Sequence, residues 1–134
     1  MRSFLFVPGD STRKFESAKK TAADALILDL EDSIAPDQKV VARGITREML
    51  DARNPEQKLY IRVNALDTDL TLGDLAAVMP GKPDGIVLPK CAGAADVNKL
   101  ALYLDAFEAA SGIAQGTTRI ITRSEERRVG KECR

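Results

Sequence analysis

Three carboxylates stand close together at the end of one short apolar segment. Residues 25–30 read Ala-Leu-Ile-Leu-Asp-Leu, and Asp29, Glu31 and Asp32 fall within four positions of the chain. Like charges this close to a buried segment need a counter-charge or a bound cation. Oxygen ligands of this kind suit Mg²⁺. The sequence therefore indicates a site that binds a metal ion or another cation.

Other polar residues end other apolar segments. Pro8-Gly9-Asp10, Arg62-Val63-Asn64 and Pro89-Lys90 each close such a segment. If the segments are parallel strands, their carboxyl ends meet at one edge, and these side chains converge with the three acids. Taken singly, these residues have simpler interpretations. Arg62 could be an arginine at a sheet edge and Lys90 a solvated loop lysine. Asp10 could cap a helix, and Glu31 and Asp32 could cap a turn.

Composition excludes several kinds of site. The 134-residue chain has no histidine, which removes Ser-His-Asp, Cys-His and His-zinc chemistry. Two cysteines are too few for a disulfide framework. With zero formal net charge and no apolar run near the length of a membrane span, we expect neither nucleic acid nor membrane partners. The N-terminus lacks a signal-peptide pattern, so we expect a cytoplasmic protein.

Apolar runs and amphipathic segments alternate along the chain, which predicts an α/β fold with parallel strands. The runs expected to form strands are 4–8, 25–30, 59–65, 85–89 and 118–122, and those expected to form helices are 11–21, 37–53, 69–79 and 93–111. We expect Asp37 to cap its helix and Gly112 to end the last helix. The buried stripe of the helix over 37–53 is expected to consist of Val40, Val41, Ile45, Met49 and Leu50. Two architectures fit: a complete doubly wound domain, or the first half of a (β/α)8 barrel.

Several blocks together resemble one enzyme family. The stretch RSFLFVPGDSTRKFESAKKTAADALILDLEDSIAPDQKVVAR, followed by YIRVNAL and DGIVLPK, is similar to the N-terminal half of the citrate lyase β-subunit family. These are CoA-ester lyases of the HpcH/HpaI aldolase superfamily. The resemblance covers residues 2 to about 122 and implies an incomplete (β/α)8 TIM barrel of about five strands and four helices.

The resemblance also implies a reaction. Such enzymes cleave a citryl-, malyl- or citramalyl-CoA-like thioester into acetyl-CoA and an oxo acid, with Mg²⁺ polarising the oxo-acid carbonyl. Arg62 matches the arginine that binds the substrate carboxylate, and Phe6 and Arg13 match positions near the substrate or CoA. The matching catalytic-site residues, which we expect to hold Arg62 and the metal's water shell in place, are Asp29, Glu31, Asp32 and Lys90.

The same resemblance implies two metal ligands that this sequence does not contain at the matching positions. The family's Glu and Asp metal ligands follow the fifth and sixth strands, where this chain instead reads RSEERRVGKECR. We interpret 1–122 as half of the barrel domain and 123–134 as an artefactual charged tail. Intact family members are expected to be homo-oligomers, commonly trimers.

A barrel with five of eight strands has consequences for stability. We expect two unpaired sheet edges, an uncovered inner face, and a chain that is unstable or aggregates and is inactive alone. Two alternatives remain: a non-catalytic Mg²⁺-binding signalling domain of the receiver type, and a binding subunit of a lyase complex. The receiver pattern fits poorly, because its acidic pair would follow the first strand.

Overall fold

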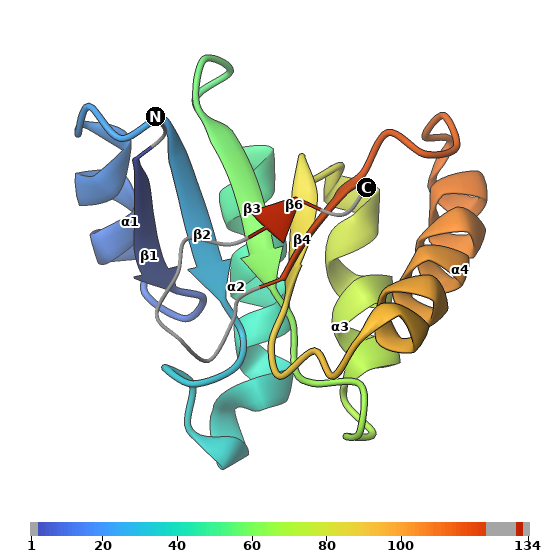
Figure 1. Ribbon diagram of the computed structural model, residues 1–134. Helices are drawn as coiled ribbons and strands as arrows, with labels where there is room; N and C mark the ends of the chain where they lie inside the picture. Colours follow the sequence, from blue (N-terminus) through green and yellow to red (C-terminus); the bar gives the residue numbers. More distant parts are fainter. Residues whose placement is uncertain (1–2, 123–130, 133–134) are drawn as a thin grey trace.

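Strands and helices alternate along the chain as expected (Figure 1). The computed structural model describes residues 3–122 and 131–132. The strands are β1 (Phe4–Pro8), β2 (Ala25–Asp29), β3 (Lys58–Arg62), β4 (Gly85–Leu88), β5 (Arg119–Thr122) and β6 (Lys131–Glu132). The α-helices are α1 (Thr12–Lys19), α2 (Lys39–Asp51), α3 (Thr71–Val78) and α4 (Ala94–Ser111), and two 3-10 turns are η1 (Pro36–Gln38) and η2 (Met79–Gly81).

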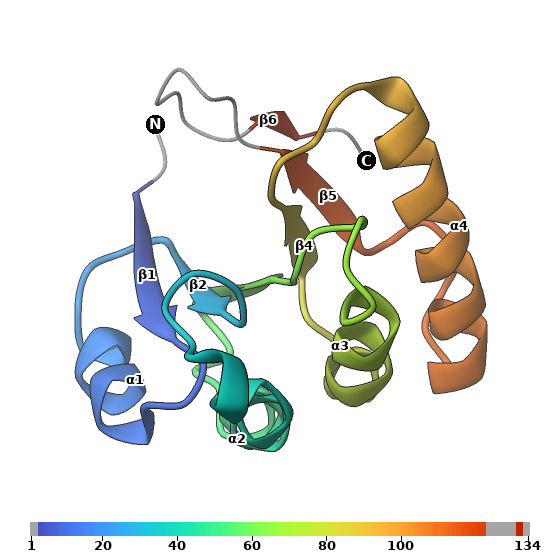
Figure 2. The ribbon, with the colours of Figure 1, turned by 90° about the horizontal axis from the view of Figure 1, so that it is seen from below.

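The order of the strands distinguishes between the two architectures. β1 to β5 are parallel and lie side by side in the order of the sequence. A flavodoxin-like sheet would have the order 2-1-3-4-5, with helices on both faces. Figure 2 shows instead that the sheet curls into an open arc with α1 to α4 on its outer side. The fold is therefore that of an incomplete (β/α)8 barrel.

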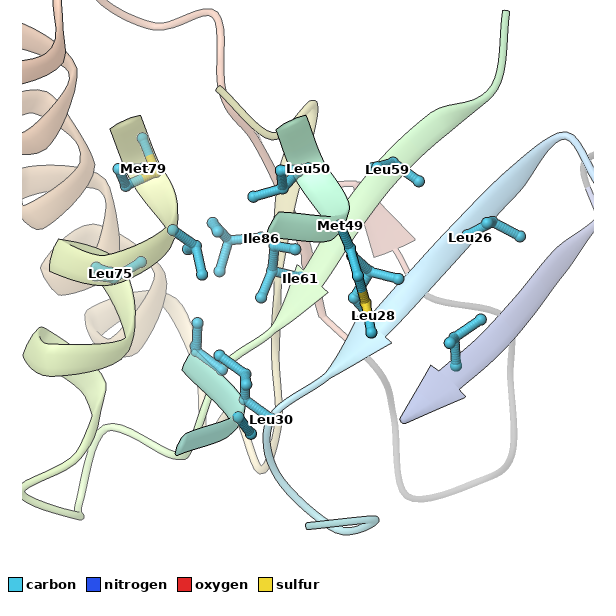
Figure 3. Packing of buried hydrophobic residues seen from close by; sticks show 14 of the residues in the cluster. Leu26, Leu28, Leu30, Met49, Leu50, Leu59, Ile61, Leu75, Met79 and Ile86 are labelled. Atoms are coloured by element: carbon cyan, nitrogen blue, oxygen red, sulfur yellow. The ribbon is translucent and has the colours of Figure 1, made fainter. Parts of the chain in front are cut away.

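The strands β2 to β5 bury side chains on both faces of the sheet. On the outer face, Leu26, Leu28, Leu59, Ile61 and Ile86 pack under the helices with residues such as Met49 and Leu75 (Figure 3). On the inner face, a second cluster consists of Ala25, Ile27, Tyr60, Val87 and Ile121, with Phe4 packed against it. Burial on both faces explains why the strands read as continuous apolar runs.

The inner face is not uncovered, so that expectation was wrong. The five residues of the inner cluster have exposed fractions of 0–6%. The curl of the sheet turns these side chains toward one another, and the Phe4 ring contacts Tyr60 edge-on with a centroid separation of 6.0 Å. The inner cluster is therefore packed, whereas Phe6 of β1 is 38% exposed.

The two edges of the sheet differ. Within the described ranges, β1 has a partner on one side only. β5 is paired on its far side with β6, where Ile121 aligns with Glu132 and Thr122 with Lys131 in antiparallel register. Within the described residues the sheet thus has the two expected edges, but the second edge is β6 and not β5. Apart from Lys131 and Glu132, the predicted charged tail lies outside the described residues, and its interpretation stays a prediction.

The buried side of α2 agrees with the predicted one only in part, at Met49 and Leu50 and at the partly buried Ile45. Ala42, Thr46, Met49 and Leu50 are buried, whereas Val40 and Val41 are 67% and 55% exposed. The Thr46 hydroxyl donates to the Gly9 carbonyl (2.9 Å), and a Cβ on Gly9 would lie 2.5 Å from that hydroxyl. This close approach of helix and loop needs small residues, and it turns the two valines outward.

Helix ends were predicted with mixed success. Asp37 lies within η1, and α2 begins after Gln38 without a side-chain cap, so the prediction for Asp37 was wrong. At α1 the cap is Ser11, whose hydroxyl accepts from the Lys14 N–H, and not Asp10. Gly112 ends α4 with a φ of +72°, as expected for a C-terminal glycine.

None of the helices in residues 3–122 combines the length and hydropathy needed to cross a membrane.

Candidate functional site

An ion pair between neighbouring strands forms the centre of the candidate site. Asp29 ends β2 and Arg62 ends β3, and the two are aligned in the sheet. Arg62 donates from Nε to Asp29 Oδ1 (2.9 Å) and from Nη2 to Asp29 Oδ2 (2.8 Å). The side chains are 13% and 2% exposed. Such two-pronged pairing fixes the plane of the guanidinium group.

The Asp29 carboxylate is also bound by its own loop. It accepts from the N–H of Glu31 (2.8 Å) and from both the N–H and hydroxyl of Ser33 (3.0 and 2.7 Å). Burial alone would raise the pKa of Asp29, but the hydrogen bonds from Arg62 and the loop outweigh it and lower that pKa to about 2. Asp29 is therefore ionised in the folded protein, and both of its carboxylate oxygens accept hydrogen bonds from Arg62 and from the loop.

One edge of the Arg62 guanidinium remains open. Phe6 of β1 lies under its face, with Cζ 4.8 Å from the ring centroid. Nη2 is 4.0 Å from Asp32 Oδ2 and Nε is 3.6 Å from Glu31 Oε1. Both hydrogen bonds that the guanidinium donates within the described part of the chain come from Nε and Nη2, so Nη1 donates none there. Its donors are thus available to a second carboxylate.

Glu31 lies between two cations. Its Oε2 is 3.5 Å from Lys90 Nζ, and its side chain is 9% exposed. Burial raises the pKa of Glu31, the Asp32 carboxylate raises it further, and Arg62 and Lys90 oppose this only in part. Asp32 is 76% exposed at the outer side of the cluster, and Lys90 is 69% exposed. These carboxylates therefore keep a local excess of negative charge.

This arrangement predicts that Glu31→Gln raises the free energy of unfolding at pH 7. The folded pKa of Glu31 lies above the ordinary value of 4.5, so the folded state binds the proton more tightly than the unfolded state. Stability is therefore lost as the pH rises from 4.5 through the folded pKa, and glutamine removes that loss. Urea unfolding of both proteins at pH 4 and pH 7 measures it. Equal free energies at pH 7 would contradict the prediction.

Two residues of this site were missed from the sequence. Ser33 binds Asp29, as described above. Lys39, the first residue of α2, places its ammonium between the carbonyl oxygens of Leu30 (3.1 Å) and Glu31 and Asn64 Oδ1 (2.9 Å). Lys39 lies in the stretch that carries the family resemblance, but its position in the sequence does not reveal that its contacts are mostly to backbone carbonyls.

Arg13 and Asp10 are not drawn into the cluster. Arg13 lies on the exposed side of α1 and forms no hydrogen bond or ion pair with other described residues. Its predicted role near the substrate or CoA stays a prediction. The structure does bring together Phe6, Asp29, Glu31, Asp32, Arg62 and Lys90.

A small cavity adjoins this cluster. It has a volume of about 210 Å³ and lies between the loops that follow β3 and β4. Leu66 and Pro89 line it from the two loops, together with Lys90, Asp67 and Asp96. Lys90 therefore borders both the cavity and Glu31.

The described carboxylates do not form a metal site on their own. No group of three or more Asp, Glu or Cys residues in the described ranges is placed to hold an ion. Asp29 is saturated by hydrogen bonds, and Glu31 faces two cations. The counter-charge that the acidic run required is therefore Arg62, assisted by Lys90.

Comparisons with known proteins agree with this fold. The HpcH/HpaI aldolase/citrate lyase family matches residues 2–128. A (3S)-malyl-CoA thioesterase of Cereibacter sphaeroides is 42% identical over 101 residues, which are 75% of this chain and 35% of that protein. Citrate lyase subunit beta of Escherichia coli is 36% identical over 127 residues, covering 92% of this chain and 41% of that protein.

A solved structure shows the same arrangement. The citrate lyase β subunit of M. tuberculosis, complexed with oxaloacetate and magnesium, has a TM-score of 0.67 and 32% identity, covering 89% of this chain and 45% of that one. The chain thus spans less than half the length of each of these relatives. The matched family region, the strand order and the similarity in sequence agree, and the chain belongs to the HpcH/HpaI aldolase/citrate lyase family.

Proposed function

We propose that this chain carries the carboxylate-binding side of a carbon–carbon lyase site. The substrate would be a CoA thioester of a hydroxy acid, like citryl-, malyl- or citramalyl-CoA. The observation that supports this most is the open Nη1 edge of Arg62, on a guanidinium group held by Asp29 and stacked on Phe6. A planar guanidinium fixed in this way can bind a second carboxylate in a defined orientation.

Each residue of the cluster has a role in this proposal. Arg62 binds the carboxylate beside the hydroxyl-bearing carbon, which becomes the oxo acid. Asp29 is a positioning residue, because its oxygens are occupied by Arg62 and the loop. Glu31, Asp32 and Lys90 set the charge around this carboxylate, and the cavity beside Lys90 offers space next to it.

The reaction itself is a retro-aldol (Claisen-type) cleavage of a β-hydroxy thioester. The hydroxyl loses its proton, the bond between the hydroxyl-bearing carbon and the thioester α-carbon breaks, and its electrons form the thioester enolate. The enolate then takes up a proton and gives acetyl-CoA, and the hydroxyl-bearing carbon becomes the carbonyl of the oxo acid. The described residues supply the carboxylate anchor for this reaction, and we assign none of them as the base.

Mg²⁺ enters the proposal only for the whole enzyme. Magnesium and oxaloacetate are bound in the tuberculosis relative, and the metal would polarise the oxo-acid carbonyl there. Because the described carboxylates do not form a site for it, its ligands would lie outside the described residues. For this reason we expect the chain alone to bind an oxo acid but not to cleave a thioester.

Hydrolysis of the thioester is the second candidate activity. It is favoured by the 42% identity to a (3S)-malyl-CoA thioesterase. Malyl-CoA distinguishes between the two reactions, because cleavage gives acetyl-CoA and glyoxylate whereas hydrolysis gives CoA and malate. The carboxylate anchor would be used in the same way in both.

The test combines binding and product analysis on the full chain. Oxaloacetate is titrated into the chain by calorimetry, with and without Mg²⁺, and malyl-CoA is incubated with the chain and analysed by mass spectrometry. We expect oxaloacetate to bind and no product to form. Failure of a folded chain to bind oxaloacetate would overturn the proposal. CoA and malate as products would replace cleavage by hydrolysis, and acetyl-CoA and glyoxylate would show that the chain alone is active.

A further inference from the structure

Lys39 occupies an unusual position for a lysine. It is the first residue of α2, where the helix dipole favours acidic side chains and disfavours cations, and the first turn of α2 holds no acid. Helix stability therefore does not explain the lysine. Instead, its ammonium contacts the Leu30 and Glu31 carbonyl oxygens and Asn64 Oδ1, which occupies all three of its N–H donors.

The peptide group between Leu30 and Glu31 is held at both ends. Its carbonyl oxygen accepts from Lys39 Nζ (3.1 Å) and from Asn64 Nδ2 (3.0 Å). Its N–H donates to Asp29 Oδ1 (2.8 Å). The negative end of the peptide dipole thus faces a cation and the positive end faces an anion, so each contact strengthens the other.

This peptide connects Lys39 to the carboxylate-binding arginine. The Asp29 oxygen that accepts from the peptide N–H also accepts from Arg62 Nε (2.9 Å). Asn64, on the far side of Lys39, is held in turn by Asp74, which accepts from its N–H (2.9 Å) and its Nδ2 (2.8 Å). The contacts therefore run without a gap from Asp74 through Asn64, Lys39 and the peptide to Asp29 and Arg62.

We propose that Lys39 is a positioning residue, which orients the Arg62 guanidinium for its substrate carboxylate through the Leu30–Glu31 peptide and Asp29. Without the ammonium, the Leu30 carbonyl keeps only its hydrogen bond from Asn64 Nδ2. The peptide is then held less rigidly, and the hydrogen bond from its N–H to Asp29 weakens. Arg62 would still pair with Asp29, but less rigidly. The inference rests on the proposed function only for its binding readout.

The test uses three variants of the full chain, and a fourth, Lys39→Ala, for chemical rescue. Lys39→Met removes the ammonium but keeps the apolar stem, and Lys39→Arg restores a cation. Arg47→Met is the matched control, because it removes one positive charge from the same helix on its exposed side. Each protein is titrated by carboxyl-carbon NMR to measure the pKa of Asp29, and oxaloacetate affinity is measured by calorimetry.

For Lys39→Met we expect the pKa of Asp29 to rise by up to about one unit, which is the change expected if one hydrogen bond to a carboxylate is lost completely. Oxaloacetate affinity should fall about tenfold, and Lys39→Arg should recover part of both losses. Arg47→Met should leave both unchanged.

Two further outcomes separate a positioning role of Lys39 from a purely structural one, and failure of this inference from failure of the proposed function. If Lys39→Met lowers the melting temperature but leaves the Asp29 pKa and the affinity unchanged, Lys39 is only structural and the inference is overturned. If the wild-type chain does not bind oxaloacetate, the proposed function fails, and the Asp29 pKa alone still decides the role of Lys39. Propylammonium added to Lys39→Ala should restore the Asp29 pKa, because it returns an ammonium to the same three oxygens.

Discussion

Asp29→Asn should lower the free energy of unfolding at pH 7 by about 2 to 4 kcal/mol. The lower figure follows from the fall of the Asp29 pKa from 3.8 to about 2, and the higher from leaving a partly buried Arg62 without its main partner. For a domain of this size that is a large share of the total stability. Urea unfolding of the variant and the wild type at pH 7 measures the difference.

The pH dependence of this effect has a definite sign. The folded pKa of Asp29 is below its unfolded value, so its contribution is fully present above pH 3.8 and is lost as the pH falls toward 2. Wild type and variant should therefore converge near pH 2. The matched control is Asp37→Asn, an exposed carboxylate in η1, which should change stability little. A difference between Asp29→Asn and wild type that persists at pH 2 would contradict this account.

Arg62→Lys should weaken oxaloacetate binding by about 30-fold, which corresponds to about 2 kcal/mol for a lost two-pronged contact. A lysine ammonium can pair with Asp29 or with the substrate, but it cannot present separate edges to both, as the guanidinium does. Because the ion pair with Asp29 is partly kept, stability should fall less than in Asp29→Asn. Calorimetric titration of oxaloacetate into both proteins measures the effect.

The control for this variant is Arg47→Lys, on the exposed side of α2. It makes the same chemical change away from the cluster and should leave the affinity unchanged. If Arg62→Lys binds oxaloacetate as tightly as the wild type, Arg62 is not the carboxylate anchor, even if the variant is less stable.

Much of the fold could be predicted from the sequence, because runs such as 25–29 and 85–88 are apolar at every position or nearly so. Such runs require burial on both faces, which the two clusters provide. The buried side of α2 could be predicted only in part. Hydropathy favours Met49 and Leu50, which are buried, but it also favours Val40 and Val41. The fold instead places Thr46 against the Gly9 loop.

The centre of the site was predictable for an electrostatic reason. Three acids at a buried strand end require a counter-charge, and Arg62 ends the neighbouring strand at the aligned position. The supporting residues were not predictable in the same way. Lys39 binds mainly backbone carbonyls, which every residue has, so no pattern of side chains reveals its partners. The assignment of Arg13 remains a prediction.

The central claim is that Asp29 holds one edge of the Arg62 guanidinium while the other edge binds the substrate carboxylate. Nitrogen NMR of the chain with labelled arginine, followed during an oxaloacetate titration, tests it most directly. The account predicts that the Nη1 signal of Arg62 shifts and saturates, while the Nε signal, held by Asp29, stays nearly constant. Saturable binding of oxaloacetate with no change at Arg62 Nη1, or with a shift at Nε as its ion pair opens, would contradict it.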